Sequence, residues 1–95
     1  MMTELDPLLH SQLRLAIMSI LLSADEADFV YLKTKTEATA GNLSIQLDKL
    51  SQAEYITVTK TNEGTRPRTI CQITERGRKA MAEYVEALRS YLTNL

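Results

Sequence analysis

The sequence predicts one small, mainly α-helical domain that carries a single β-hairpin. Its 95 residues suffice for one hydrophobic core but not for two. Apolar residues recur with the period of a helix in the first half and at the end of the chain, whereas the period falls to two after residue 54. With 44% hydrophobic and 24% charged residues, the composition is that of an ordinary folded domain.

Two helices are expected in the first third of the chain. Starting near His10, apolar residues recur with the spacing of one helix face, at Leu13, Ala16, Ile17, Ile20 and Leu21. The opposite face is apolar too, because it carries Leu15, Met18 and Leu22, and we expect another surface to cover it. Ser23 to Asp25 break this helix and offer N-cap residues for a second helix of about two turns, which ends near Lys35.

A third helix is expected within residues 36–55. Thr39 is a competent N-cap, and three leucines follow on one face, at Leu43, Leu47 and Leu50. The other side of the helix presents a mostly polar row, made of Asn42, Ile45, Gln46 and Lys49. Gly41 in the first turn costs about 1 kcal/mol of helix propensity relative to alanine, so we expect another backbone to approach closely there.

A β-hairpin follows the third helix. Strand residues alternate with threonines and other polar residues, at Tyr55, Ile56, Val58, Ile70 and Ile73. The segment 61–67 between the strands contains asparagine, glycine and proline, which favour turns. Three cations crowd this tip, namely Lys60, Arg66 and Arg68. The pattern therefore predicts a hairpin with a flexible, basic tip.

A long helix over residues 75–93 is expected to close the domain. Thr74 is its expected N-cap, and Glu75 in the first turn complements the positive end of the helix dipole. An apolar seam repeats in threes and fours along it, at Met81, Tyr84, Val85, Leu88, Tyr91, Leu92 and Leu95. The resulting order, α-α-α-β-β-α with a long C-terminal helix, is typical of a winged helix-turn-helix domain, to which we assign residues 1–95.

Charge is distributed unevenly along the chain, although the formal net charge is only −1. Residues 1–32 contain one cation and five anions, whereas residues 33–79 contain nine cations and five anions. A generic polycation that coats nucleic acid is therefore excluded, and any surface for a polyanion must lie in the middle of the chain. Asp48 and Glu63 oppose a polyanion there, so we expect modest binding by one monomer.

Two stretches resemble the small winged-helix regulators related to the MarR and ArsR groups. The first is GNLSIQLDKL at 41–50 with EYI at 54–56, and the second is RPRT at 66–69 with ITERGR at 73–78. The likeness covers about residues 8–92. The sequence departs from the family pattern at Glu54, where a glycine usually ends the helix, and at Cys71, where an aromatic residue is common. Glutamate is strained in the left-handed conformation that such a helix end requires.

The resemblance implies that the third helix enters the major groove of DNA and that the wing reaches a minor groove or phosphates. It makes Leu43, Leu47 and Leu50 core residues and packs Ser44 against the second helix. Asn42 or Gln46 can pair with adenine, and Ile45 can touch a thymine methyl group. The predicted DNA-binding residues are Thr39, Asn42, Ile45, Gln46, Lys49, Lys60, Arg66 and Arg68. There are two alternatives to these DNA contacts: the polar face of the third helix is merely solvated, and the basic tip merely keeps the edge strands soluble.

A homodimer is expected, because a two-fold pair of such domains reaches two half-sites about 34 Å apart on DNA. The candidates for its interface are apolar residues of the first and last helices: Leu9, Leu15, Met18, Leu22, Met81, Tyr84, Leu88, Tyr91, Leu92 and Leu95. The alternative is an intramolecular core in which these two helices pack only on each other.

Chemistry beyond binding is not indicated. The sequence has no glycine-rich phosphate loop and no cofactor fingerprint, so we predict no enzyme and no cofactor. His10 is the only histidine, and we expect no metal site. Cys71, the single cysteine, is interpreted as a strand residue rather than a redox sensor.

The expected partners are double-stranded DNA and a second copy of the chain, in the cytoplasm. A lone thiol fits a reducing compartment, the first residues lack a cationic signal-peptide opening, and no apolar run approaches the roughly 20 residues that span a bilayer, so no membrane partner is expected. A small-molecule effector between the first and last helices is conceivable but has no sequence signal. The alternative function is a winged-helix module for protein contacts, favoured by the near-neutral charge.

Overall fold

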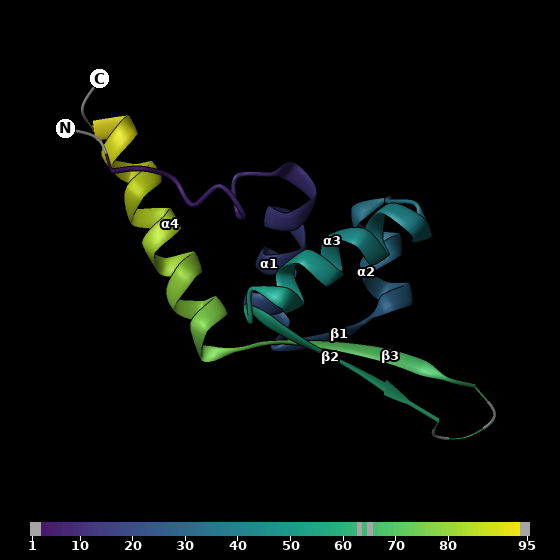
Figure 1. Cartoon of the computed structure of the whole chain (residues 1–95). Helices are drawn as coiled ribbons and strands as arrows, with labels where there is room; N and C mark the ends of the chain where they lie inside the picture. Colours follow the sequence, from purple (N-terminus) through teal and green to yellow (C-terminus); the bar gives the residue numbers. More distant parts are fainter. Residues whose placement is uncertain (1–2, 63, 65, 94–95) are drawn as a thin grey trace.

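The computed structural model describes residues 3–62, 64 and 66–93. In chain order it contains α1 (Gln12–Ala24), β1 (Glu26–Asp28), α2 (Phe29–Thr36), α3 (Ala40–Gln52), β2 (Ile56–Thr61), β3 (Arg68–Ile73) and α4 (Glu75–Thr93). The helices, the hairpin and their order confirm the predicted winged-helix fold (Figure 1). The short strand β1 is an addition, because three residues carry too little periodicity to reveal a strand.

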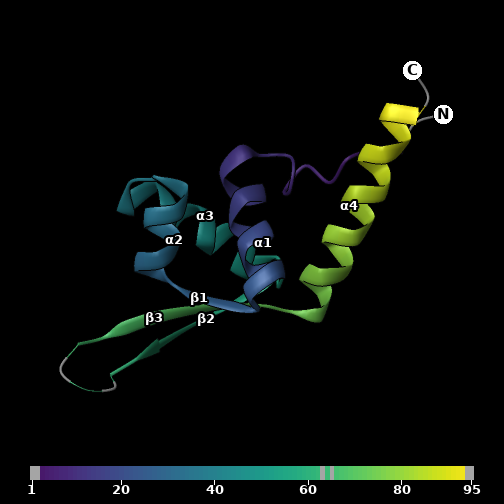
Figure 2. The ribbon, with the colours of Figure 1, turned by 180° about the vertical axis from the view of Figure 1, so that it is seen from behind.

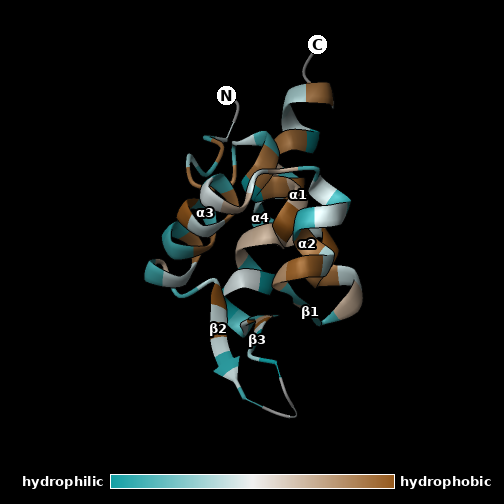
Figure 3. Cartoon of the chain, turned by 90° about the vertical axis from the view of Figure 1, so that its right-hand side faces the viewer, coloured by the Kyte–Doolittle hydropathy of each residue, from teal (hydrophilic) through white to brown (hydrophobic). Residues whose placement is uncertain are grey.

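Helix α1 is the central helix of the domain. It contacts α2, α3, α4, β1 and β3, and it lies among the other helices in Figure 3. The chain itself therefore covers part of the second apolar face of this helix. Leu9 and Met18 are fully buried within one chain, so their prediction as dimer-interface residues is wrong. Leu15 is half-buried, and Leu22 keeps 39% of its surface exposed.

The link from α1 to α2 differs from the expected one. Asp25 ends α1 with a φ of 70°, and β1 then pairs antiparallel with β3, with Ala27 opposite Cys71. Helix α2 begins after β1, because Asp28 Oδ1 accepts the Tyr31 N–H at 2.8 Å and so caps the helix. The N-cap of α2 therefore lies at Asp28 and not within residues 23–25.

Helix α3 begins as the sequence indicates. Thr39 Oγ1 accepts the Asn42 N–H at 3.2 Å, and the helix buries Leu43, Leu47 and Leu50. Two expectations for this helix are wrong. Ser44 is exposed rather than packed against α2. A Cβ added to Gly41 would have no neighbour within 4 Å, so no other backbone segment among the described residues approaches there.

The end of α3 adopts a Schellman motif around a strained glutamate. The Glu54 N–H donates to the Ser51 carbonyl at 2.9 Å, and the Tyr55 N–H donates to the Leu50 carbonyl at 3.0 Å. Glu54 itself has a φ of 64°, in the left-handed region where glycine is usual. The strain expected at this departure from the family pattern is therefore present.

Replacing Glu54 with glycine is expected to stabilise the fold by about 1 kcal/mol, because glycine adopts this φ without a Cβ penalty. The glutamate side chain adds little to the stability of the fold, because it is 78% exposed and its carboxylate lies 4.0 Å from the Arg76 guanidinium. Chemical denaturation of both chains measures the difference. Glu54→Ala is the matched control, because it removes the ion pair but keeps the Cβ. An equal gain in that control would show that backbone strain is not the cause.

Strands β2 and β3 form the wing, and β1 lies on the other side of β3, so the sheet order is β1-β3-β2. Ile56 pairs with Ile73 at the base of the hairpin, and Thr61 pairs with Arg68 at its outer end. Ile56 and Cys71 are buried against the helices, which anchors the base. The outer half projects from the domain, as both Figure 1 and Figure 2 show.

The start of helix α4 is hydrogen-bonded to the two residues at the exit of α3. The Thr74 N–H donates to the Tyr55 carbonyl at 3.0 Å, and the Thr74 hydroxyl donates to the Glu54 carbonyl at 2.7 Å. The same hydroxyl accepts the Gly77 N–H at 3.0 Å, which confirms Thr74 as the N-cap. Gly77 lies so close to this junction that an added Cβ would collide with the Tyr55 carbonyl oxygen.

The C-terminal half of α4 leads away from the other helices (Figures 1 and 2). Met81 and Tyr84, in the first half, are buried within one chain, so their prediction as dimer-interface residues is wrong. Leu88 and Leu92 are 40% and 66% exposed, and Leu95 lies outside the described residues. Ala87, in the second half, is also buried, so the alternative of an intramolecular contact holds for the first half of α4 and for this residue.

The segment before α1 is fixed by Asp6. Asp6 Oδ1 accepts the Leu8 N–H at 2.9 Å, and Asp6 Oδ2 accepts the Tyr55 hydroxyl at 2.6 Å. Burial, followed by this bond, raises the pKa of Tyr55 to about 12, so the hydroxyl stays a donor at neutral pH. Nearby, His10 Nδ1 and the Tyr84 hydroxyl share a hydrogen bond of 3.0 Å.

Candidate nucleic-acid interface

Helix α3 exposes a row of side chains away from its buried leucines. Asn42, Ile45 and Lys49 are exposed, and Ile45 keeps 54% of its surface open to solvent. Thr39 is exposed as well, although its hydroxyl is used as the N-cap. Four of the five α3 residues predicted to bind DNA are therefore accessible, and they combine amide, hydroxyl, apolar and cationic groups.

Gln46, the fifth of these residues, is half-buried and points toward α1. Its Oε1 accepts a hydrogen bond from Arg14 Nη1 at 2.5 Å, and its Nε2 donates to Asn42 Oδ1 at 3.0 Å. Both ends of the amide are thus engaged within the chain. No local pattern predicts this contact, because Arg14 lies 32 positions away on the central helix.

The wing carries cations in two different states. Lys60 and Arg66 are exposed, and neither forms an ion pair with another described residue. Arg68 is 54% exposed, and its Nη2 lies 2.9 Å from Asp28 Oδ2. The Tyr31 N–H and then Arg68 lower the pKa of Asp28, so this carboxylate is ionised at neutral pH and balances Arg68. Glu63 lies outside the described residues.

The basic middle part of the sequence contributes two further cations, which lie on α2. Lys33 and Lys35 are exposed in the last turn of α2, and Lys35 Nζ lies 5.7 Å from the centre of the Tyr31 ring. The exposed acidic residues Glu83 and Glu86 belong to α4 instead. The basic part of the sequence therefore forms α2, α3 and the wing, whereas the exposed anions of the C-terminal part lie on the projecting helix.

Other kinds of site have little support in the described residues. Burial, and then the charge of Asp28, raise the pKa of Cys71 to about 11, so this buried thiol is protonated at neutral pH. Within residues 3–62, 64 and 66–93, no three His, Cys, Asp or Glu side chains are grouped to hold a metal ion. None of the helices described is long and apolar enough to cross a membrane.

A helix-turn-helix whose second helix exposes a polar row, followed by a cationic hairpin, defines the class of winged-helix DNA-binding proteins. The chain belongs to the winged helix DNA-binding domain family, whose model matches residues 13–92. It is also 31% identical to an uncharacterized protein of Methanocaldococcus jannaschii, over 90% of this chain and 94% of that protein. Family and fold are those of transcriptional regulators and not of enzymes.

Solved structures of transcriptional regulators share the fold of this chain. A transcriptional regulator homologue from Pyrococcus horikoshii OT3 has a TM-score of 0.85 and 26% identity, over 92% of this chain and 86% of that one. BldR from Sulfolobus solfataricus has a TM-score of 0.73 and 25% identity, over 88% of this chain and 59% of that one. A MarR-family regulator from Silicibacter pomeroyi, 20% identical, shares the fold with a TM-score of 0.69 over 88% of this chain and 56% of that one. The predicted resemblance to small winged-helix transcriptional regulators is thereby confirmed.

Proposed function

We propose that the chain is a sequence-specific transcriptional regulator of the cytoplasm that binds DNA as a homodimer. The observation that carries this proposal is the exposed side of α3 together with Lys60 and Arg66 of the wing, which form no ion pair with another described residue. Helix α3 enters the major groove, where Asn42 reaches base edges and Ile45 touches a thymine methyl group. Thr39 and Lys49 hold phosphates on either side.

The wing completes this proposed contact. Lys60 and Arg66 reach phosphates or a minor groove, and binding releases counterions from the DNA. Arg68 contributes less, because Asp28 already balances its charge. Exposed Asp48 on α3 opposes the phosphates, so one monomer binds weakly and two are needed. A small-molecule effector has no assigned site among the described residues, and DNA binding by the dimer does not require one.

The homodimer is proposed to form through the projecting half of α4. Val85, Leu88 and Leu92 are 46%, 40% and 66% exposed, and their spacing of three and four places them in one stripe. An apolar stripe on the solvent-exposed side of a helix is stabilised when a second helix covers it. Half-buried Tyr91 extends the stripe, and Leu15 and Leu22 of α1 are the remaining candidates.

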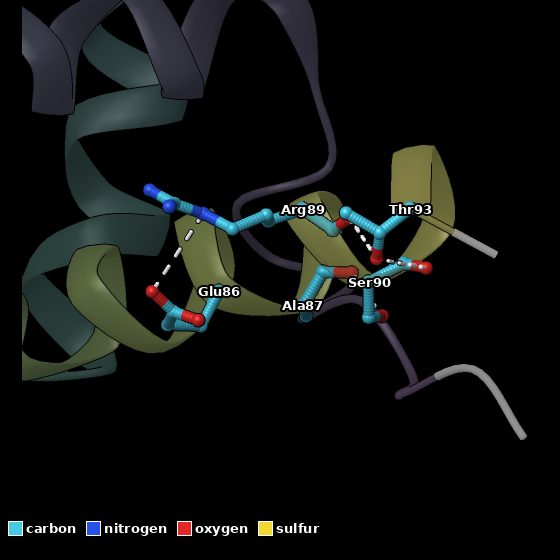
Figure 4. A network of polar contacts seen from close by, with 5 residues as sticks. All are labelled: Glu86, Ala87, Arg89, Ser90 and Thr93. Atoms are coloured by element: carbon cyan, nitrogen blue, oxygen red, sulfur yellow. Dashed lines mark hydrogen bonds and ion pairs between the residues drawn. The ribbon is translucent and has the colours of Figure 1, made fainter.

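Polar groups of the same turns do not interrupt this stripe. Figure 4 shows that they bond within α4: Arg89 Nε lies 3.8 Å from Glu86 Oε1, and the Thr93 hydroxyl donates to the Arg89 carbonyl at 3.1 Å. Helix geometry places Glu86 on the side away from the stripe, whereas Arg89 and Thr93 border it. A second α4 can therefore pack on the stripe without burying an unpaired polar group.

Removing one wing cation tests the DNA contact. Arg66→Ala is expected to weaken binding to a duplex selected by the wild-type chain, and to reduce the slope of log affinity against log salt by about one. Arg68→Ala is expected to change the slope less, because that charge is already paired. Fluorescence anisotropy at several salt concentrations measures both. The matched control is Arg89→Ala on the projecting helix, which should leave affinity and slope unchanged.

Two results would contradict the proposal. Equal salt slopes for the wild type and Arg66→Ala would remove the wing from the interface. Failure to bind any duplex at low salt, with recovery of a specific protein partner, would favour a winged-helix module for protein contacts. Asp48, exposed on the presumed DNA side of α3, would then be part of a protein-binding surface.

A further inference from the structure

A row of hydrogen bonds connects the central helix to the exposed face of α3. Arg14 Nε donates to the Leu8 carbonyl at 2.6 Å, which fixes the guanidinium. Arg14 Nη1 donates to Gln46 Oε1 at 2.5 Å, and Gln46 Nε2 donates to Asn42 Oδ1 at 3.0 Å. Arg14 and Gln46 are half-buried, whereas Asn42 at the end of the row is exposed.

The direction of every bond in this row is set by Arg14. A guanidinium has donors only, so Gln46 must turn its carbonyl oxygen toward Arg14 and its amide nitrogen away from it. That nitrogen is also a donor only, so Asn42 must turn its carbonyl oxygen toward Gln46. The other group of Asn42, its NH₂, then faces away from Gln46.

We propose that Arg14 is a positioning residue that sets the base preference of the chain by making Asn42 a hydrogen-bond donor in the major groove. This inference rests on the proposed DNA-binding function. An asparagine with both groups free pairs with adenine, donating to N7 and accepting from N6. Asn42 Oδ1 is turned toward Gln46 and uses one of its two lone pairs there, so it is less available to adenine N6 than the outward NH₂ is to an acceptor. Guanine offers two acceptors, N7 and O6, and is therefore the base that Asn42 prefers.

The experiment is a selection of bound duplexes from a random library, read by sequencing. Asn42→Ala first identifies the position that Asn42 reads, as the one where base preference disappears. The wild-type chain is expected to select guanine there. Arg14→Met frees the Gln46 amide and should reduce the preference for guanine over adenine about tenfold.

Gln46→Glu gives the sharper result, because a carboxylate accepts from both Arg14 and Asn42. Asn42 must then donate to Glu and turn its carbonyl outward, so the preference should move to a base that offers a donor, adenine or cytosine. A merely structural role for Gln46 would lower affinity without this change of base. Lys49→Ala is the matched control on the same helix, and should weaken binding to all sequences equally.

The hydrogen bonds are also measurable without DNA. The side-chain NH₂ signals of Gln46 in nuclear magnetic resonance should exchange slowly with solvent in the wild type and faster in Arg14→Met. Equal exchange rates, or guanine retained at the Asn42 position in both Arg14→Met and Gln46→Glu, would overturn the inference alone. Selection of no duplex by the wild type would overturn the proposed function, and the inference with it.

Discussion

Gly77→Ala is expected to destabilise the domain by about 2 to 3 kcal/mol, although alanine is the better helix former by about 1 kcal/mol. The added Cβ would collide with the Tyr55 carbonyl oxygen, which is backbone and also accepts the Thr74 N–H. Relief requires α4 to shift away from the end of α3. For a domain of this size the loss corresponds to a melting temperature roughly 10 to 20 °C lower, measurable by circular dichroism.

Gly41→Ala is the matched control for this prediction. Gly41 also lies in the first turns of a helix, but an added Cβ there would have no neighbour within 4 Å. The substitution should therefore stabilise the free chain by up to about 1 kcal/mol. The two glycine-to-alanine substitutions are therefore expected to change stability in opposite directions. A loss of stability at both positions, or at neither, would show that the contact with Tyr55 is not what requires glycine at 77.

The second large effect is expected from Leu88→Glu combined with Leu92→Glu. Leu88 and Leu92 are 40% and 66% exposed in one chain, so the substitutions should leave the domain folded. Two like charges in the proposed stripe should prevent two α4 helices from packing. The chain should then have the mass of one copy in light scattering. Affinity for a two-half-site duplex should fall about 100-fold, because the second half-site no longer binds from the same molecule.

Glu86→Ala is the control for the dimer, since Glu86 lies on the side of the helix away from the stripe and its removal breaks only an exposed ion pair. It should leave both the mass and the affinity unchanged. A double-glutamate variant that keeps the wild-type mass would place the dimer contact elsewhere. A wild-type chain that is itself monomeric at the concentrations where it binds DNA would remove the homodimer from the proposed mechanism.

The sequence predicted the elements whose pattern is local. Leu43, Leu47 and Leu50 marked the buried face of α3, and Thr39 and Thr74 marked two helix starts, because a cap and an apolar period are contained within a few residues. Asp28 was also recognisable in principle, since an aspartate directly before an apolar run is an N-cap signal. It was missed because Asp25 offered the same signal three residues earlier.

The errors concern contacts between distant segments. The apolar residues around α1 and along the seam of α4 indicated covered helices, but periodicity does not state whether the same chain or a second one covers them. Leu9, Met18, Met81 and Tyr84 were therefore assigned to a dimer, whereas one chain buries all four. The same limit applies to the candidate site. The pairing of Arg68 with Asp28, and of Arg14 with Gln46, joins positions 40 and 32 residues apart.

The junction at Thr74 has a mechanical consequence. Thr74 bonds to two successive carbonyls at the end of α3, and Gly77 leaves no gap between the two helices. The angle between α3, which is proposed to read DNA, and α4, which is proposed to pair two chains, is therefore set by the contacts at Thr74. In such a dimer, a few degrees of rotation at Thr74 change the distance between the two α3 helices over the length of α4. Operator spacing is then encoded at a position that contacts neither the DNA nor the second chain.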